Sequence, residues 1–124
     1  MAWNMDNSRP IYAQLVERLQ VQIVSGRYRP GERLPSVREL AAVAAVNPNT
    51  MQKAFAELEK SGLIITQRTN GRMVTEDEEL IQRSRRKLAE GHRNSYFAGM
   101  KELGYSEDEA AAMLQEMRGG TGNE

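Results

Sequence analysis

The sequence predicts a mainly α-helical protein that contains one small β-hairpin. Apolar residues recur at helical spacing along most of its 124 residues, and capping residues mark several helix starts. The exception is segment 63–68, rich in β-branched residues, which is followed by turn residues at 69–71 and by a returning segment, 72–74. The expected architecture is a small helical domain with a hairpin, followed by a further helical region.

The first predicted helix begins at Pro10 and ends at Gly26. Its apolar positions recur every four residues, which gives a stripe suited to core packing: Ile11, Leu15, Leu19 and Ile23. The following segment, 27–33, is predicted to be a loop because it contains Pro30 and Gly31. The three arginines of this loop could touch the backbone of DNA, but we expect them to be solvated.

Two short capped helices joined by a tight turn come next. Ser36 and Glu39 have the S-x-x-E spacing of a capping box. The second helix is predicted from about Pro48 to Lys60, with Asn47 as its N-cap. Its apolar face is formed by Met51, Ala54, Phe55 and Leu58, and its opposite face by Asn49, Gln52, Lys53 and Ala56. This is the layout of a helix-turn-helix whose second helix presents amides and a cation to the edges of DNA bases.

The hairpin completes the pattern of a winged helix-turn-helix, in which the hairpin is the wing. Residues 10–75 resemble the GntR family of bacterial transcription regulators, whose amino-terminal module has this fold. The resemblance rests on I-Y at 11–12, G-R-Y-R-P-G-E-R-L-P-S at 26–36, R-E-L-A at 38–41, V-N-P-N-T at 46–50, L-E at 58–59 and G-L-I at 62–64. The remainder is similar to the short helical tail of the YtrA-type subfamily, through E-E-L-I at 78–81 and E-L-G-Y-S-E at 102–107.

The resemblance implies three regions and a fold class that is mainly α with a small β-hairpin. Residues 9–75 would form a winged helix-turn-helix DNA-binding domain. Residues 76–118 would form a short α-helical dimerisation tail. The glycine-rich end, 119–124, is expected to be disordered.

The family pattern also indicates which residues would bind DNA. It places a DNA-contacting arginine at Arg38 and often uses the position of Gln52 for base contact, where a glutamine can bond an adenine edge twice. At the wing, Thr69 replaces a second glycine and Arg72 replaces a small hydroxyl residue, which favours contact by side chains such as Arg68 over close backbone approach. The expected DNA-binding residues are Ser36, Arg38, Asn47, Asn49, Thr50, Gln52, Lys53, Arg68, Asn70, Gly71 and Arg72.

The tail is predicted to contain three short helices. A capping box of Thr75 and Glu78 would start the first helix, and one of Ser106 and Glu109 would start the last. Such helices cannot close a core by themselves in about fifty residues, so their apolar side chains are expected to pack against a second copy of the chain. The expected dimer interface consists of Leu80, Ile81, Leu88, Tyr96, Phe97, Met100, Leu103 and Leu114.

The formal net charge of zero conceals an uneven distribution. Residues 9–75 contain ten Lys or Arg and five Glu, whereas residues 76–124 contain seven basic and eleven acidic residues. A basic first half suits a phosphate backbone, since phosphate neutralisation supplies most non-specific affinity for DNA. A solvated charge asymmetry without a partner would give the same pattern.

Composition argues against several other classes. The chain has no cysteine and a single histidine, His92, so neither a disulfide framework nor a usual zinc ligand set can be assembled. No phosphate loop, dinucleotide fingerprint or nucleophile elbow is present. We expect no enzymatic activity, no cofactor and no metal. No apolar run approaches the roughly 18 residues of a membrane span, and no signal peptide pattern is visible, so a cytoplasmic protein is expected.

The sequence therefore predicts a homodimeric, sequence-specific regulator that binds double-stranded DNA at an inverted-repeat operator, most simply as a repressor. The resemblance to YtrA-type regulators implies control of its own operon and of neighbouring transporter genes. Two alternatives stay open. One is a winged helix that binds a protein partner, and the other is a DNA-binding regulator gated by an unknown small-molecule effector at the tail dimer interface.

Overall fold

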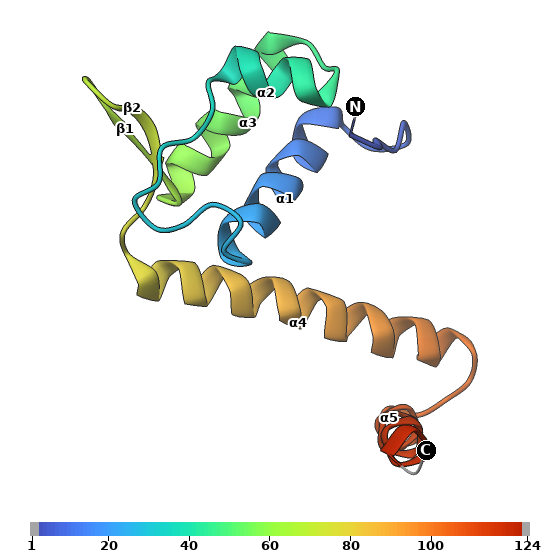
Figure 1. The fold of residues 1–124 in the computed structure, drawn as a ribbon. Coiled ribbons are helices and arrows are strands. Elements are labelled where there is room, and N and C mark those ends of the chain that lie inside the picture. Colours follow the sequence, from blue (N-terminus) through green and yellow to red (C-terminus); the bar gives the residue numbers. More distant parts are fainter. Residues whose placement is uncertain (1–2, 123–124) are drawn as a thin grey trace. The chain divides into compact units, whose positions relative to one another are not determined.

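The computed structural model describes the backbone of residues 3–122 and the side chains of residues 3–119. In chain order the elements are α1 (Ile11–Val24), α2 (Val37–Ala44), α3 (Pro48–Ser61), β1 (Ile64–Gln67), β2 (Gly71–Val74), α4 (Glu78–Glu102) and α5 (Glu107–Gly122) (Figure 1). The chain divides between Arg85 and Arg86 into two compact units. The first unit holds α1 to β2 and the start of α4, and the second holds the rest of α4 and α5.

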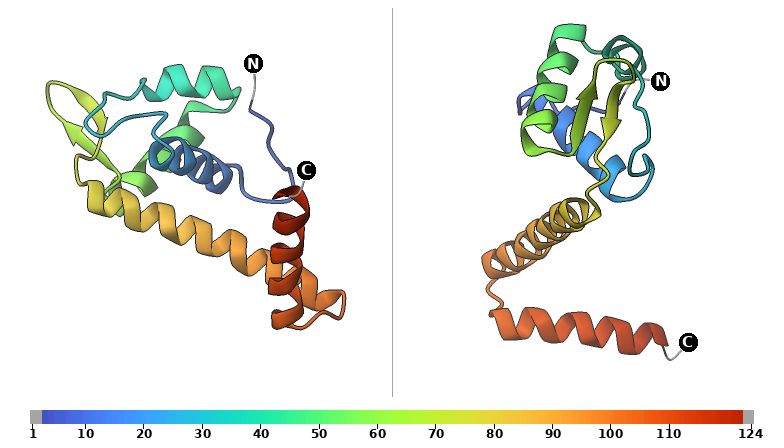
Figure 2. Two further views of the ribbon diagram at one scale, coloured as in Figure 1. Left: turned by 60° about the horizontal axis from the view of Figure 1, so that its bottom comes forward. Right: turned by 90° about the vertical axis from the view of Figure 1, so that its left-hand side faces the viewer.

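Helix α3 is the centre of the first unit. It contacts α1, α2 and β1, and Figure 2 shows these elements around it from two further sides. The core of the unit is made of fully or nearly fully buried apolar side chains: Leu15, Leu19, Ile23, Leu34, Leu40, Ala41, Ala44, Met51, Ala54, Phe55, Leu58, Leu63, Ile64, Val74 and Ile81. The predicted apolar stripes of α1 and α3 are thus confirmed as core faces.

Local capping explains where α2 begins. The Ser36 hydroxyl accepts a hydrogen bond from the Glu39 N–H at 3.1 Å, and the Glu39 carboxylate accepts one from the Ser36 N–H at 3.0 Å. The hydrogen bond that the Ser36 backbone N–H donates to the carboxylate is the main cause that holds the pKa of Glu39 below its ordinary value, and the Ser36 side chain adds to it. The predicted capping box is therefore present.

Residues close in sequence also determine the turn between α2 and α3 and both ends of α3. Ala45 closes α2 in the left-handed conformation with φ 60°, a position that the sequence does not mark with glycine. The Asn47 side-chain oxygen accepts from the Asn49 N–H at 2.8 Å, and Pro48 occupies the first helical position. Gly62, with φ 87°, ends the helix.

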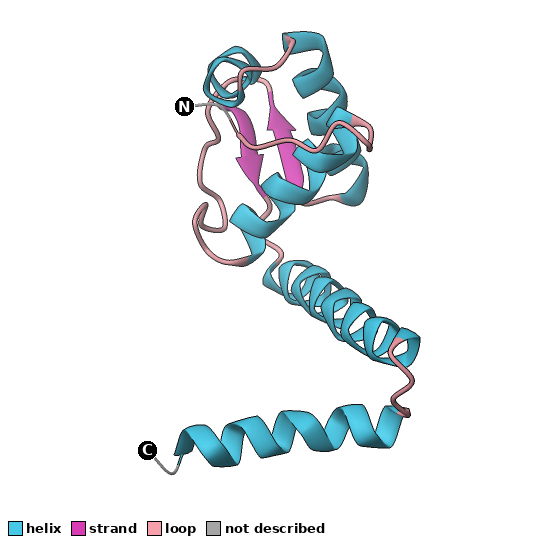
Figure 3. Ribbon diagram, turned by 90° about the vertical axis from the view of Figure 1, so that its right-hand side faces the viewer, coloured by secondary structure: helices cyan, strands magenta, loops and turns pink. Residues whose placement is uncertain are grey.

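The two strands of the hairpin lie side by side in Figure 3 and are antiparallel. Ile64 is opposite Val74, and Thr66 is opposite Arg72. Part of the predicted loop 27–33 lies along the free edge of β2. There the Gly31 N–H donates to the Val74 carbonyl at 2.9 Å and the Leu34 N–H donates to the Arg72 carbonyl at 2.8 Å. The sequence did not reveal this pairing, because residues 31–34 contain none of the alternation typical of a strand.

The start of α4 differs from the prediction. Asp77 caps the helix by accepting a hydrogen bond from the Leu80 N–H at 3.1 Å, while the Thr75 hydroxyl accepts one from the Asp77 N–H at 3.1 Å, so the Thr75 and Glu78 capping box is wrong. Ile81 is only 6% exposed and belongs to the core of the first unit, with Leu80 packed against the same core. Ile81 was predicted to lie in the dimer interface, but its side chain is taken up by the core of the first unit, which also partly covers Leu80. The unit therefore extends past residue 75.

The second unit contains two helices where three were predicted. α4 continues without a break through Gly91, His92 and Gly99 because a glycine inside a helix costs only about 1 kcal/mol relative to alanine. The capping box of Ser106 and Glu109 is confirmed, with bonds of 2.8 and 3.1 Å. α5 runs to Gly122 where a disordered end was expected, and residues 123–124 lie outside the described part of the chain.

A hydrogen bond from Tyr96 and the small buried residue Ala110 help to join the two helices of the second unit. The Tyr96 hydroxyl donates to the Ala110 carbonyl at 2.7 Å, and Ala110 is almost fully buried. The Tyr96 and Phe97 rings meet edge to face with centroids 5.2 Å apart. Large apolar side chains nonetheless stay exposed in this unit, including Leu103 at 73% and Leu114 at 49%.

Replacing Ile81 with alanine tests the revised boundary. Ile81→Ala should lower the free energy of unfolding of the full chain by about 2–5 kcal/mol, because it leaves a cavity in the core of the first unit. Urea unfolding at two protein concentrations measures the loss. Val43→Ala, at an exposed position of α2, is the control and should change stability by no more than about 0.5 kcal/mol. A loss that disappears at high protein concentration would instead assign Ile81 to a subunit interface.

The capping box predicts a pH dependence. Because the pKa of Glu39 is depressed in the folded protein, its carboxylate stabilises fully above the ordinary glutamate value of about 4.3, and this stabilisation is lost as the pH falls through the lower folded value. Glu39→Ala should therefore melt at a lower temperature than the wild type at neutral pH, and the difference should shrink in acid. A difference that does not change with pH would show that the carboxylate charge is not responsible.

Candidate nucleic-acid interface

The predicted DNA-binding residues come from three elements of the first unit: the start of α2, the outer face of α3 and the wing. Most of these residues are exposed: Ser36, Arg38, Asn47, Asn49, Gln52, Lys53, Arg68 and Asn70. Thr50, Gly71 and Arg72 are partly buried. All three elements belong to one packed unit, so the fold holds them on a common scaffold.

The outer face of α3 follows from the burial of its inner face. Because Phe55 and Leu58 are fully buried, the helical repeat turns Asn49, Gln52 and Lys53 outward. The Asn47 side-chain oxygen is used in capping, which leaves its amide N–H groups to donate elsewhere. This face thus offers amide donors and acceptors together with one cation, which are the groups that bond base edges.

Lys53 has a neighbour that sequence reasoning did not identify as part of the site. Its ammonium lies over the ring of Tyr12 from α1, with Nζ 4.0 Å from the ring centroid. Tyr12 and Ile11 line one shallow hollow with Asn49, Thr50 and Lys53. The four-residue stripe of α1 could not reveal this contact, because the partner is about forty residues away in the sequence.

A second hollow lies between the start of α2 and the wing. Its volume is about 190 Å³, and its lining includes Arg33, Ser36, Glu39, Gly71 and Arg72. The Arg33 guanidinium lies near Gly71, where it would be 3.8 Å from an added Cβ atom. Arg33 was expected to be a solvated loop arginine, and the structure places it beside predicted DNA-binding residues.

The wing divides its polar side chains between the tip and the base. Arg68, Thr69 and Asn70 are exposed at the tip, where the Asn70 amide donates to the Gln67 side-chain oxygen at 3.0 Å. Gly71 has φ 71°, a left-handed conformation that favours glycine. Arg68 is exposed at the wing tip, and its contact with DNA stays a prediction.

Arg72 is not at the tip. Its Nε lies 3.4 Å from Oε1 of Glu59 on α3, and its guanidinium carbon lies 5.3 Å from the centre of the Phe55 ring. The side chain is 27% exposed. Arg72 was expected to contact DNA through its side chain, but its position does not support this, because its cation already faces an acid and a ring.

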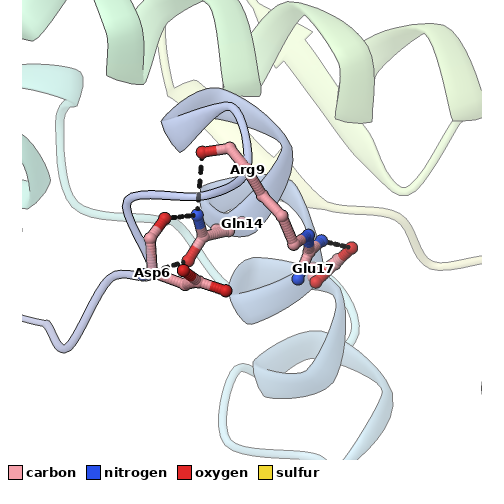
Figure 4. Close-up of polar contacts among 4 residues, drawn as sticks. All are labelled: Asp6, Arg9, Gln14 and Glu17. Carbon is pink, nitrogen blue, oxygen red and sulfur yellow. Dashed lines mark hydrogen bonds and ion pairs between the residues drawn. The ribbon is translucent and has the colours of Figure 1, made fainter.

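Basic side chains near the amino terminus are also occupied. Arg9 forms an ion pair with Glu17, and Gln14 exchanges hydrogen bonds with the backbone of Asp6, as Figure 4 shows. The Arg18 guanidinium carbon lies 5.0 Å from the centre of the Trp3 ring. These contacts fasten segment 3–9 to α1 and engage two of the unit's cations within the protein.

Within residues 3–122, no group of three or more His, Cys, Asp or Glu side chains is arranged to hold a metal ion. No helix in that part of the chain is both long and apolar enough to cross a membrane.

The residues that form the winged helix-turn-helix are also those that match a known protein family. Residues 11–74 match the family described as bacterial regulatory proteins, gntR family. The transcriptional regulator YhcF of Bacillus subtilis is 37% identical over 109 residues, which cover 85% of this chain and 90% of YhcF. The transcriptional repressor YtrA of the same organism is 44% identical over 71 residues, or 57% of this chain and 55% of YtrA.

A solved structure extends the likeness to the three-dimensional fold. A GntR family transcriptional regulator from Listeria monocytogenes superposes with a TM-score of 0.82 at 38% identity, covering 90% of this chain and 98% of the Listeria chain. The winged-helix fold, the family match and the YhcF relationship agree with one another. The chain therefore belongs to the GntR family of bacterial regulatory proteins and is a DNA-binding transcriptional regulator.

Proposed function

We propose that this regulator is a homodimeric repressor that binds double-stranded DNA at an inverted-repeat operator. The observation that carries the proposal is the separation of two kinds of surface. The first unit exposes amide and basic side chains on α2, α3 and the wing tip. The second unit leaves Leu103 73% exposed, more than any of the exposed large apolar side chains described in the first unit, which reach 50%. One surface suits nucleic acid and the other suits a protein partner.

DNA recognition would use α3 in the major groove, as the second helix of a helix-turn-helix does. Gln52 can bond an adenine edge with both its oxygen and its nitrogen, and Arg38 at the start of α2 can bond a guanine edge in the same way. Lys53 and Arg68 would contact phosphates or the adjacent groove and supply the electrostatic part of the affinity.

A second copy of the chain is the partner we propose for the second unit. Leu103 and Leu114 remain exposed there, and large apolar side chains left in water on a small helical unit favour contact with a protein partner. A two-fold dimer presents its two α3 helices to half-sites about one helical turn apart, roughly 34 Å, which requires an inverted repeat. From the predicted interface we retain Leu88, Tyr96, Phe97, Met100, Leu103 and Leu114.

Repression is proposed from relatedness. The relative YtrA is named as a transcriptional repressor. A dimer that occupies an operator can repress by excluding other proteins from the same DNA. Control of the regulator's own operon and of neighbouring transporter genes is proposed on the same basis, from the resemblance to YtrA-type regulators.

Selection from random double-stranded DNA at near-physiological salt tests the recognition surface. An inverted repeat with steeply salt-dependent affinity is expected, and Arg38→Ala should weaken binding to it by about 1–3 kcal/mol while relaxing the preference at one base pair. Arg27→Ala removes the same charge from the loop after α1 and should leave the preference unchanged. A uniform loss for Arg38→Ala would indicate phosphate contact, and the absence of any enriched sequence would favour a protein partner for this surface.

The dimer is tested by placing a charge on its apolar surface. Leu103→Glu should convert the protein to a monomer and weaken operator binding by about 100-fold or more, because the two half-sites are then bound independently. Analytical ultracentrifugation and operator titration measure the two effects. Asn94→Glu adds the same charge at an exposed polar position of α4 and should remain dimeric. A Leu103→Glu protein that stays dimeric would exclude Leu103 from the interface.

A further inference from the structure

We propose that Glu59, Thr66 and Arg72 form a clamp that fixes the wing against α3, so that the wing and the recognition helix meet DNA as one rigid body. These three residues are named the Glu59 clamp. Arg72 then acts on DNA binding through the position of the wing and makes no DNA contact of its own. The inference rests on the proposed contact between the wing tip and DNA.

One carboxylate reaches both strands of the wing. The Thr66 hydroxyl of β1 donates a hydrogen bond to Oε2 of Glu59, and Nε of Arg72 on β2 lies 3.4 Å from Oε1. Thr66 and Arg72 are directly opposed in the antiparallel register, so their side chains project from the same face of the hairpin. That face is the one turned towards α3.

The Arg72 side chain is also held by the core. Phe55 precedes Glu59 by four residues on α3, so the two side chains are neighbours on one face of the helix. The guanidinium covers the ring of Phe55, and the Phe55 side chain is fully buried. Moving Arg72 outward to a phosphate would uncover this ring and leave Glu59 without its ion pair. Both costs favour the observed position.

The clamp is placed where it controls the wing tip. A two-stranded hairpin is only marginally stable alone, and β1 and β2 have four residues each. β1 starts two residues after α3, beyond Gly62. Arg68 and Asn70 lie past the clamp at the far end of the strands, so a change in tilt at Thr66 and Arg72 displaces both tip residues together.

Partial burial makes the contact stronger than an ordinary surface ion pair. The side chains of Glu59 and Arg72 are 31% and 27% exposed, whereas the pair formed by Glu57 and Lys60 on the same helix is much more open to solvent. Surface pairs contribute little because water screens them. Glu57 therefore provides a matched control, with the same charge on the same helix and no connection to the wing.

The salt dependence of operator binding separates the two roles of Arg72. A side chain that neutralises a phosphate releases counterions. Its removal therefore makes the negative slope of log affinity against log salt shallower by about 0.9. A side chain that only positions the wing releases none. Arg72→Ala should therefore weaken operator binding by about fivefold to tenfold, the size usual for members of one contact network, with the slope unchanged.

Glu59→Ala tests the clamp from its other side. Loss of an acidic residue near DNA would by itself tighten binding, and Glu57→Ala measures that charge effect alone. We expect Glu59→Ala to weaken binding instead. In hydroxyl-radical footprinting, the DNA positions contacted by the wing should lose protection, while those contacted by α3 should keep it. The double variant of Glu59→Ala and Arg72→Ala should bind about as weakly as either single variant, because both changes open the same clamp.

All measurements use the full chain, and circular dichroism melts establish that each variant is folded at the assay temperature. If Arg72→Ala does not fold, Glu59→Gln carries the test, since it keeps an acceptor for Thr66 and removes the charge that faces Arg72. Glu59→Gln should weaken operator binding less than Glu59→Ala does, and it should reduce protection of the DNA contacted by the wing less.

Three results would overturn the clamp. The first is a shallower salt slope for Arg72→Ala, and the second is operator binding by Glu59→Ala that is as tight as that of Glu57→Ala. The third is a double variant whose loss of operator affinity equals the sum of the two single losses. Each leaves the DNA-binding proposal standing, because the wild type still protects its operator. A wild type that protects the α3 contacts but not the wing would overturn the proposed wing contact itself, and the clamp with it.

Discussion

Burial of one face of α3 is the constraint on which the structure depends. Met51, Ala54, Phe55 and Leu58 are fully buried, and α1, α2 and β1 all contact this helix. Burying one side of a helix fixes its rotation about its own axis, since side chains three and four residues apart share a face. The outward direction of Asn49, Gln52 and Lys53 is thus a consequence of core packing, and the candidate DNA-binding face depends on it.

Packing of the first unit also decides which of its arginine side chains are engaged within the protein and which stay exposed. Arg72 covers Phe55 and faces Glu59, so a cation that would suit a phosphate contributes to the joint between α3 and the wing. Arg9 and Arg18 are engaged by Glu17 and Trp3. The basic character of the first half of the chain is therefore shared between internal contacts and a smaller set of exposed cations, among them Arg38, Lys53 and Arg68.

In the predicted tail, packing and the continuity of α4 decide which residues belong to the core of the first unit and which remain exposed. Ile81 has the apolar spacing of a tail helix, yet it completes the core of the first unit because the start of α4 follows β2 by only three residues. α4 then runs without a break from Glu78 to Glu102, where two separate short helices were predicted. What remains for a partner is the apolar surface beyond residue 85, which includes the exposed Leu103 and Leu114.

The sequence by itself determined the elements whose signals are local. Ser36 with Glu39, and Asn47 with Pro48, fixed the starts of α2 and α3, and the apolar spacing identified their buried faces, because caps and helical repeats involve residues only three or four positions apart. From these elements the helix-turn-helix and the general location of the candidate site could be predicted, while the family came from the resemblance of the motifs in residues 10–75. The tertiary structure alone decided that Arg72 joins Glu59, that Lys53 lies over Tyr12, and that Ile81 enters the core. Each of these partners is distant in the sequence, and no local pattern records which side chain another will meet once the elements pack.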